Sequence, residues 1–197
     1  MNRDRQEIRV LVIGTDPARA AILEEGLVAD GYARVMVIHS LHNLAERVVL
    51  LDPDVLLIDM AGPDREALES LYPVLPGLKR PIAVFVDHAD GAMIKTAIEA
   101  GVSAYVVDGL KKERVRSIVE VAISRFRVFE RLSRERDEAR LKLADRKIIE
   151  QAKGLLMARR RLDEEAAYQA LRKAAMQQNR RLVDIAASVI TAMQLEL

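Results

Sequence analysis

The first half of the chain alternates between short apolar runs and longer amphipathic stretches. The apolar runs, rich in Val, Ile and Leu, lie at 8–13, 35–38, 55–58, 81–86 and 104–107. The segments between these runs carry apolar residues at helical spacing, over 17–30, 41–51, 64–75 and from about Ile94 to Gly101. Parallel strands that are covered by helices on both faces are apolar along their whole length. The pattern therefore predicts a five-stranded parallel sheet between two layers of helices.

The second half is helical in character throughout. Neither Gly nor Pro occurs between Leu110 and Lys153, which predicts one long helix. Its apolar stripe consists of Val115, Val119, Ala122, Phe126 and Phe129 and continues loosely through Leu132, Ala139 and Leu143. Because residues 130–147 are polar on all sides, a second copy would supply the missing burial. We interpret 112–145 as a parallel coiled-coil linker of a homodimer, and the alternative is a single solvated helix.

Two shorter helices follow and complete a predicted three-helix bundle. Asp163 is placed to cap the first of them, with acidic residues in its first turn. The residues expected to face the bundle core are Ala166, Ala170, Leu171, Ala174, Leu182, Ile185, Ala186, Val189, Ile190 and Met193. A glycine inside a helix costs up to about 1 kcal/mol relative to alanine. We therefore expect another helix or a nucleic acid to approach Gly154 closely.

Charge divides the chain at Gly109. Residues 1–110 hold 10 basic and 17 acidic side chains, a net charge of −7, whereas residues 111–197 hold 21 and 13, a net charge of +8. All six Pro and eight of the nine Gly also lie in residues 1–109. The division predicts two domains, of which the second is a candidate for binding a polyanion.

Composition also removes several classes of function. The chain has no Cys, which excludes a disulfide framework, a thiolate metal site and a cysteine nucleophile. Its three His follow no metal-ligand spacing, and no convergent catalytic set is visible, so we expect no enzyme. The polar N-terminus and the lack of about 18 consecutive apolar residues predict a cytoplasmic protein with no membrane association.

Two segments of the first half resemble two-component receiver domains. Pro53–Asp59, with the sequence PDVLLID, resembles the third strand of that family, whose terminal Asp accepts a phosphoryl group. Residues 100–105, with the sequence AGVSAY, resemble the entry to the fifth strand. The resemblance covers roughly residues 7–125. It implies an α/β receiver domain with a flavodoxin-like five-stranded sheet over 1–125, and it makes Asp59 a candidate phosphoacceptor.

The surroundings of Asp59 depart from the receiver pattern. Phosphoryl transfer there needs Mg²⁺ held by acids after strand one, a hydroxyl after strand four and a lysine after strand five. These positions are occupied by Gly14, Thr15, Val86 and Asp108. Asp16 and Asp59 remain as weak Mg²⁺ candidates, and we expect no cofactor unless Asp59 is phosphorylated. We predict a degenerate receiver that works mainly as a protein-docking module, with a functioning phosphoacceptor as the alternative.

The C-terminal segments Arg146–Met157, Glu164–Met176 and Asn179–Ala186 resemble the ANTAR domain, the RNA-binding module of AmiR/NasT-type antiterminators. With a degenerate receiver upstream, the chain is similar to the nitrate-assimilation members of that family. The resemblance implies an all-α ANTAR domain over 140–197 that binds paired stem-loops in mRNA leaders. It also implies control by a small-molecule sensor protein that acts as a repressor.

The candidate RNA-binding residues come from the basic positions and the glycine of that motif. They are Arg146, Lys147, Lys153, Gly154, Arg172, Lys173, Arg180 and Arg181. The run from Arg159 to Arg161 fits a solvated helix end as well as it fits an RNA contact. Tyr168 is expected in the core rather than against a base.

These expectations combine into a transcription antitermination regulator of nitrate or nitrite assimilation operons. One alternative is a DNA-binding response regulator that is activated by phosphorylation at Asp59. Another is a protein-interaction module with no role in nucleic-acid binding.

Overall fold

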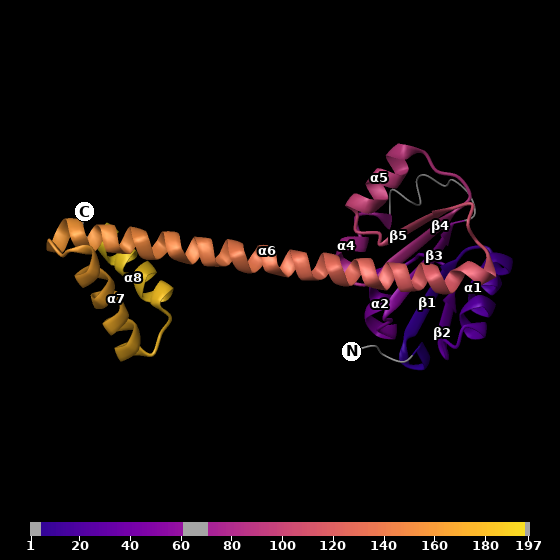
Figure 1. Cartoon of the computed structure of the whole chain (residues 1–197), viewed down its shortest axis with the longest axis horizontal. Helices are drawn as coiled ribbons and strands as arrows, with labels where there is room; N and C mark the ends of the chain where they lie inside the picture. Colours follow the sequence, from indigo (N-terminus) through magenta and orange to yellow (C-terminus); the bar gives the residue numbers. More distant parts are fainter. Residues whose placement is uncertain (1–4, 61–70, 196–197) are drawn as a thin grey trace. The chain divides into compact units, whose positions relative to one another are not determined.

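The computed structural model describes residues 5–60 and 71–195 and divides into two compact units. The N-terminal unit comprises residues 1–130, and the C-terminal unit comprises residues 131–197. The long helix α6, Lys112–Arg160, contributes its first part to one unit and its remainder to the other (Figure 1). The predicted helix at 64–75 falls mostly outside the described residues.

A single parallel sheet forms the centre of the N-terminal unit. Its strands are β1 (Arg9–Gly14), β2 (Arg34–Ile38), β3 (Val55–Met60), β4 (Ile82–Val86) and β5 (Ala104–Val107). They pair in the order β2-β1-β3-β4-β5, and each pair is parallel. This order is that of flavodoxin-like sheets. The predicted α/β fold is confirmed.

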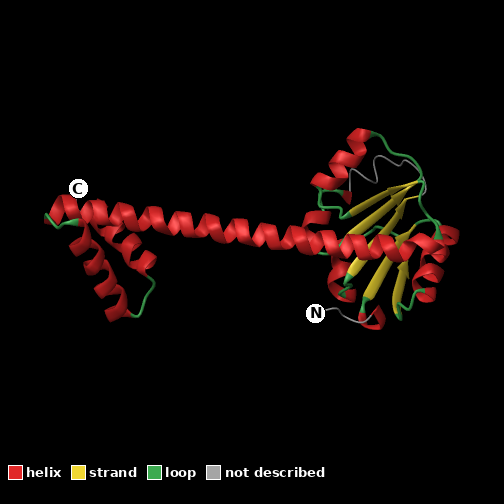
Figure 2. Ribbon diagram, viewed as in Figure 1, coloured by secondary structure: helices red, strands yellow, loops and turns green. Residues whose placement is uncertain are grey.

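Helices cover both faces of this sheet, as the ribbon diagram in Figure 2 shows. The remaining elements of the unit are η1 (Arg5–Glu7), α1 (Pro17–Ala29), α2 (Leu44–Leu51), α4 (Leu75–Leu78) and α5 (Gly91–Glu99). Along β1, Val10 and Val12 pack with α1 and α6, whereas Leu11 and Ile13 pack with α2, α4 and α5. Successive side chains of a strand point to opposite faces, so every residue of a doubly covered strand is apolar.

The first part of α6 belongs to the core of the N-terminal unit. Val115, Val119 and Ala122 are fully buried there against the sheet and α1. The first residues of the predicted apolar stripe therefore pack within the chain rather than against a second copy. Farther along α6, Phe129 and Leu132 are exposed.

The C-terminal unit is a bundle of the end of α6 with α7 (Glu164–Gln178) and α8 (Leu182–Leu195). The predicted cap of α7 is confirmed, because an Asp163 carboxylate oxygen accepts a hydrogen bond of 2.7 Å from the Ala166 amide. The predicted core position of Ala170 is wrong: Ala170 is exposed, and Ala167 and Ala175 are buried with Leu171. Small alanines on neighbouring faces of α7 give the sequence little contrast from which to infer the buried side.

Candidate functional site

Asp59 lies at the carboxyl end of β3, in the middle of the sheet of the N-terminal unit. It stands beside Gly14 in the register of β1 and β3. These two strands flank the point where the strand order reverses, and ligands of such sheets bind outside the carboxyl ends of the strands at that point. Asp59 is only 2% exposed. A carboxylate this deeply buried needs a partner for its charge.

The Arg19 guanidinium of α1 supplies that partner. Its Nε donates to Asp59 Oδ2 at 2.8 Å, and its Nη2 donates to Asp59 Oδ1 at 2.7 Å. The third nitrogen, Nη1, donates to Asp87 Oδ1 at 2.7 Å. This two-pronged pairing is the strongest geometry available to an arginine and a carboxylate. The hydrogen bonds to Asp59 raise the pKa of Arg19, which therefore stays charged.

Gly14 lets α1 lie close to this carboxylate. A β-carbon at position 14 would stand 3.2 Å from the Ala20 β-carbon and 3.7 Å from the Asp59 β-carbon. The first contact is tighter than ordinary van der Waals packing. Glycine at this position thus removes an acidic side chain and also admits the helix that carries Arg19.

The other positions of the receiver pattern do not assemble a cation site. The Asp16 side chain caps α1, because its Oδ1 accepts a hydrogen bond of 2.8 Å from the Ala18 amide. Val86 is buried, and Asp108 is an exposed residue with a φ of 47°. Mg²⁺ needs several oxygen ligands, whereas here a guanidinium already neutralises Asp59. Across residues 5–60 and 71–195, no group of three or more His, Asp or Glu is placed to hold a metal ion.

Sequence reasoning missed both Arg19 and Asp87. One signal for Arg19 was available, since it lies in the first turn of α1, where the helix dipole disfavours a positive charge. An arginine at such a position suggests a specific anionic partner. Asp87 directly follows β4 and gave no comparable signal.

The candidate RNA-binding residues of the C-terminal unit differ in their accessibility. Arg146, Lys147, Arg172 and Lys173 are exposed on α6 and α7. Lys153 is not, because its side chain is only 8% exposed. Its Nζ donates to Glu164 at 2.6 Å and to both carboxylate oxygens of Glu150 at 3.0 and 3.1 Å. These bonds, chiefly the one to Glu164, raise the pKa of Lys153, and Lys153 lowers the pKa of Glu164.

Arg180 and Arg181 are exposed residues that connect α7 to α8. Arg181 Nη2 lies 2.6 Å from Asp145 Oδ2 on α6. This ion pair places the connection beside the part of α6 that carries Arg146 and Lys147. Arg180 contacts the first turns of α8, where its Nη2 donates to Ser188 Oγ at 3.2 Å. Arg181 is therefore held beside α6 near residue 145, and Arg180 is held against α8.

Gly154 and Tyr168 are both more accessible than expected. A β-carbon at Gly154 would meet no described atom within 4 Å, so the predicted close approach of another helix is not found. Tyr168 is 39% exposed, and its predicted core position is wrong. An exposed ring on α7 is available for contact with a base.

Comparison with protein families decides the nature of this unit. Residues 137–190 match the ANTAR domain. The matched segment runs from α6 through α7 and into α8 and contains all the candidate RNA-binding residues. The predicted ANTAR domain is thus confirmed.

Two curated relatives are transcriptional or nitrate regulators. The chain is 27% identical over 182 residues to the transcriptional regulatory protein PdtaR of Mycobacterium tuberculosis, covering 92% of this chain and 89% of the relative. A nitrate regulatory protein of Klebsiella oxytoca is 51% identical over 49 residues. That match covers 25% of this chain and 12% of the relative.

Solved structures resemble the N-terminal unit. A pilus assembly-related protein of Burkholderia pseudomallei has a TM-score of 0.52 at 24% identity, and the match covers 64% of this chain and 96% of that chain. The receiver domain of a modulated diguanylate cyclase from Desulfovibrio desulfuricans has a TM-score of 0.51 at 20% identity, covering 60% and 95%. The chain therefore joins a domain of the receiver fold to an ANTAR domain. None of the helices in the described ranges is long and apolar enough to span a membrane.

Proposed function

We propose that this chain is a transcription antitermination regulator whose ANTAR domain binds stem-loops in mRNA leaders. The observation that carries the proposal is the ANTAR match at 137–190, together with the exposed cations that it contains. Arginine and lysine neutralise phosphates, and arginine also stacks on unpaired bases, which RNA loops expose. A protein that holds such hairpins prevents a competing terminator from forming.

The operons and the controlling partner belong to the same proposal. The 49-residue similarity to a nitrate regulatory protein supports leaders of nitrate or nitrite assimilation operons as targets. The acidic N-terminal half, with a net charge of −7, supplies a surface for a small-molecule sensor protein that acts as a repressor. The target operons and the sensor protein are thus proposed in addition to the ANTAR assignment.

Competition between RNA and DNA tests the central claim. Labelled leader transcripts are bound to the full chain and challenged with unlabelled leader RNA or with duplex promoter DNA. We expect the RNA to compete and the duplex to fail. Equal competition by the duplex would instead favour the DNA-binding alternative.

Salt dependence then measures the contribution of the exposed cations. If about five phosphates on single-stranded loops are neutralised, the logarithm of the association constant falls with the logarithm of salt concentration at a slope near −3.5. The double variant Arg172→Ala with Lys173→Ala is expected to reduce that slope by about 1.4, the share of two phosphates. The control Arg131→Ala with Arg134→Ala removes the same charge from exposed positions of α6 that precede the ANTAR match. Equal slopes for the two double variants would remove Arg172 and Lys173 from the interface.

The N-terminal unit works without a phosphoryl group in this proposal. The Arg19 pairing engages both Asp59 oxygens, and Asp108 replaces the lysine that would neutralise a phosphoaspartate. We therefore expect no Asp59-dependent labelling when the chain is incubated with a small phosphodonor and Mg²⁺. Stoichiometric labelling that disappears in Asp59→Asn would contradict this part of the proposal.

A homodimer through α6 completes the proposal. Four large apolar residues of this helix, Val121, Val128, Leu132 and Leu143, are between 44% and 57% exposed. A second copy of the helix, packed along this stripe, would bury them. Two ANTAR domains on one dimer would suit a leader with paired stem-loops.

A further inference from the structure

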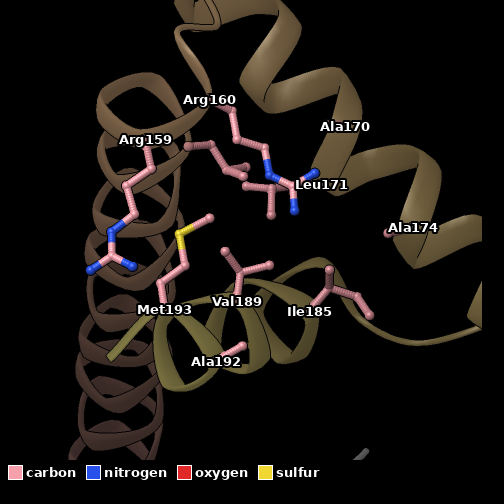
Figure 3. A pocket seen from close by; sticks show the side chains of 10 residues that line it. Arg159, Arg160, Ala170, Leu171, Ala174, Ile185, Val189, Ala192 and Met193 are labelled. Carbon is pink, nitrogen blue, oxygen red and sulfur yellow. The ribbon is translucent and has the colours of Figure 1, made fainter. Parts of the chain in front are cut away.

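The ANTAR bundle contains an open pocket of about 590 Å³ that none of the candidate RNA-binding residues lines. It lies between the end of α6, the middle of α7 and one face of α8. Its lining residues are Leu156, Arg159, Arg160, Ala170, Leu171, Ala174, Ile185, Val189, Ala192 and Met193. Figure 3 shows Arg160 extending from α6 across the pocket, with Val189 and Met193 opposite. Ligand sites in proteins have volumes of about 300–1,000 Å³, so the pocket is of ligand size.

The lining combines an apolar interior with a positive mouth. Leu156, Leu171, Ile185 and Met193 belong to the buried core cluster and form the interior. Its only charged lining residues are Arg159 and Arg160, both exposed. Within the described ranges the Arg160 guanidinium has no hydrogen-bond or ion-pair partner, in contrast to Lys153 and Arg181 of the same unit. A cation at the opening of an apolar pocket suits a ligand that has a flat apolar ring and a negatively charged group.

We propose that this pocket receives one unstacked base of the bound RNA loop. The inference rests on the proposed RNA-binding function and deepens it by naming where a base enters. The apolar walls would contact the base faces, and the Arg160 guanidinium would stack on the base or donate to its edge and to the adjoining phosphate. The unit as a whole carries 15 basic and 10 acidic residues over 131–197, which complements a phosphate chain. An amphipathic protein helix would fill the hollow but would leave the Arg160 guanidinium facing an apolar surface.

A filling substitution tests the pocket without disturbing the core. Ala192 is an exposed residue of α8 that lines the pocket, and Ala187 is an exposed residue of the same helix that does not. Ala192→Phe introduces a ring into the pocket mouth, and Ala187→Phe is the matched control. Thermal unfolding of the full chain establishes that each variant folds. The probes are hairpin RNAs selected by the wild-type chain from a library with randomised loops on an invariant stem.

Each loop nucleotide of a selected hairpin is then replaced in turn by an abasic residue. We expect one position at which loss of the base weakens wild-type binding by about 5- to 150-fold, the range for one stacked base. Ala192→Phe should weaken binding of the intact hairpin by a similar factor, and the abasic change should then have little further effect, because the two changes remove one interaction. Arg160→Met should weaken binding in the same position-specific way, and Ala187→Phe should bind as the wild type does.

Wild-type affinity for the intact hairpin in Ala192→Phe, or abasic effects of undiminished size in that variant, would overturn the pocket assignment. That result would leave the proposed RNA-binding function standing, because the wild-type chain would still bind the selected hairpins. Failure of the wild-type chain to select any hairpin over duplex DNA would overturn both.

Discussion

At the scale of single residues, one arginine sets the surroundings of Asp59 in the receiver-fold domain. Arg19 joins the buried Asp59 and the more exposed Asp87 in one network of ion pairs, in which the guanidinium supplies the positive charge beside Asp59. Both oxygens of the Asp59 carboxylate are therefore engaged by one guanidinium. The network fixes α1 to the ends of β3 and β4.

Removal of Arg19 is expected to destabilise the N-terminal unit. Arg19→Ala leaves the buried Asp59 carboxylate without its cation, at a cost of about 2–3 kcal/mol in the free energy of unfolding. This is less than a fully buried pair gives, because the Arg19 side chain is 19% exposed. Urea unfolding measures the change in the free energy of unfolding, and hydrogen exchange measures the same change at the β3 amides.

Two controls separate this effect from the mere loss of an arginine. Arg34→Ala removes an exposed arginine at the start of β2 and should change the free energy of unfolding little. The double variant Arg19→Ala with Asp59→Asn should be more stable than Arg19→Ala alone, because the uncompensated charge is gone. A cost for Arg19→Ala no larger than for Arg34→Ala would contradict the role assigned to the pair.

The ion pair of Lys153 and Glu164 predicts a pH dependence for the ANTAR domain. The pKa of Glu164 is lowered from 4.5 by Lys153, so its stabilisation is complete above pH 4.5 and is lost as pH falls through the lowered value. The pKa of Lys153 is raised from 10.5, chiefly by Glu164, so its stabilisation is complete below pH 10.5 and is lost as pH rises through the raised value. Thermal unfolding, followed by the helix signal at a series of pH values across this range, measures both the acid limb and the alkaline limb of the stability profile.

Glu164→Gln should remove the acid limb of that profile, and Glu165→Gln is its matched control. Both residues lie in the first turn of α7, and only Glu164 contacts Lys153. An unchanged acid limb in Glu164→Gln would show that the pair does not set the pH dependence.

The accuracy of the sequence-based predictions depended on the kind of signal that each residue gives. Asp59 was predicted at the strand end, because a charged residue that closes an apolar run has a definite place in a sheet. Its partner was not, since α1 and β3 are far apart in sequence and only the fold brings Arg19 to it. The local cap of Asp163 was likewise predictable. The carboxylates around Lys153 were not predicted, because a motif records residue type and spacing but not which carboxylates fold around a side chain.

At the scale of elements, α6 carries two apolar stripes with different partners. The residues of the first, Val115, Val119 and Ala122, pack on the sheet. The second contains Val121, Leu132 and Leu143 at intervals of 11 residues, with Val128 and Ala139 between them at the same interval. An 11-residue repeat corresponds to a right-handed supercoil rather than the left-handed one of heptads. The sequence pattern predicted a single apolar stripe along this helix, because both stripes have few apolar residues.

The second stripe predicts how the proposed dimer can be broken. Leu132→Glu places a charge on the stripe, whereas Leu141→Glu changes an exposed leucine about 180° away around the helix. We expect Leu132→Glu to shift the chain toward monomer by at least about tenfold in dissociation constant and Leu141→Glu to have little effect. Sedimentation equilibrium measures both. Identical association of the two variants would exclude this stripe as the dimer contact.

At the scale of the whole molecule, the near-neutral charge of +1 is the sum of two opposed parts. The receiver-fold domain carries the acidic part and the ANTAR domain carries the basic part, so the two domains present opposite charges to their surroundings. The helix α6 belongs to both domains, so an event at either end has a covalent route to the other. Domain order and charge were readable from the sequence because both are sums over many residues.

Two ANTAR domains on one dimer predict preference for paired hairpins. A transcript with two hairpins should bind about 10²- to 10⁴-fold more tightly than either hairpin alone, because the second contact is intramolecular. Leu132→Glu should lose this gain while keeping single-hairpin affinity. Electrophoretic mobility titrations with one- and two-hairpin transcripts measure it, and equal affinity for the two transcripts would contradict bivalent binding.

The Arg19 pairing also affects how genetic experiments on this protein are interpreted. Asp59→Asn and Asp59→Glu are the usual substitutions for imitating an unphosphorylated and a phosphorylated receiver. Here the first weakens a buried two-pronged ion pair, and the second forces a longer side chain into the same space. A phenotype of either variant would therefore report an altered contact between α1 and β3, and its presence would be no sign of a signalling kinase.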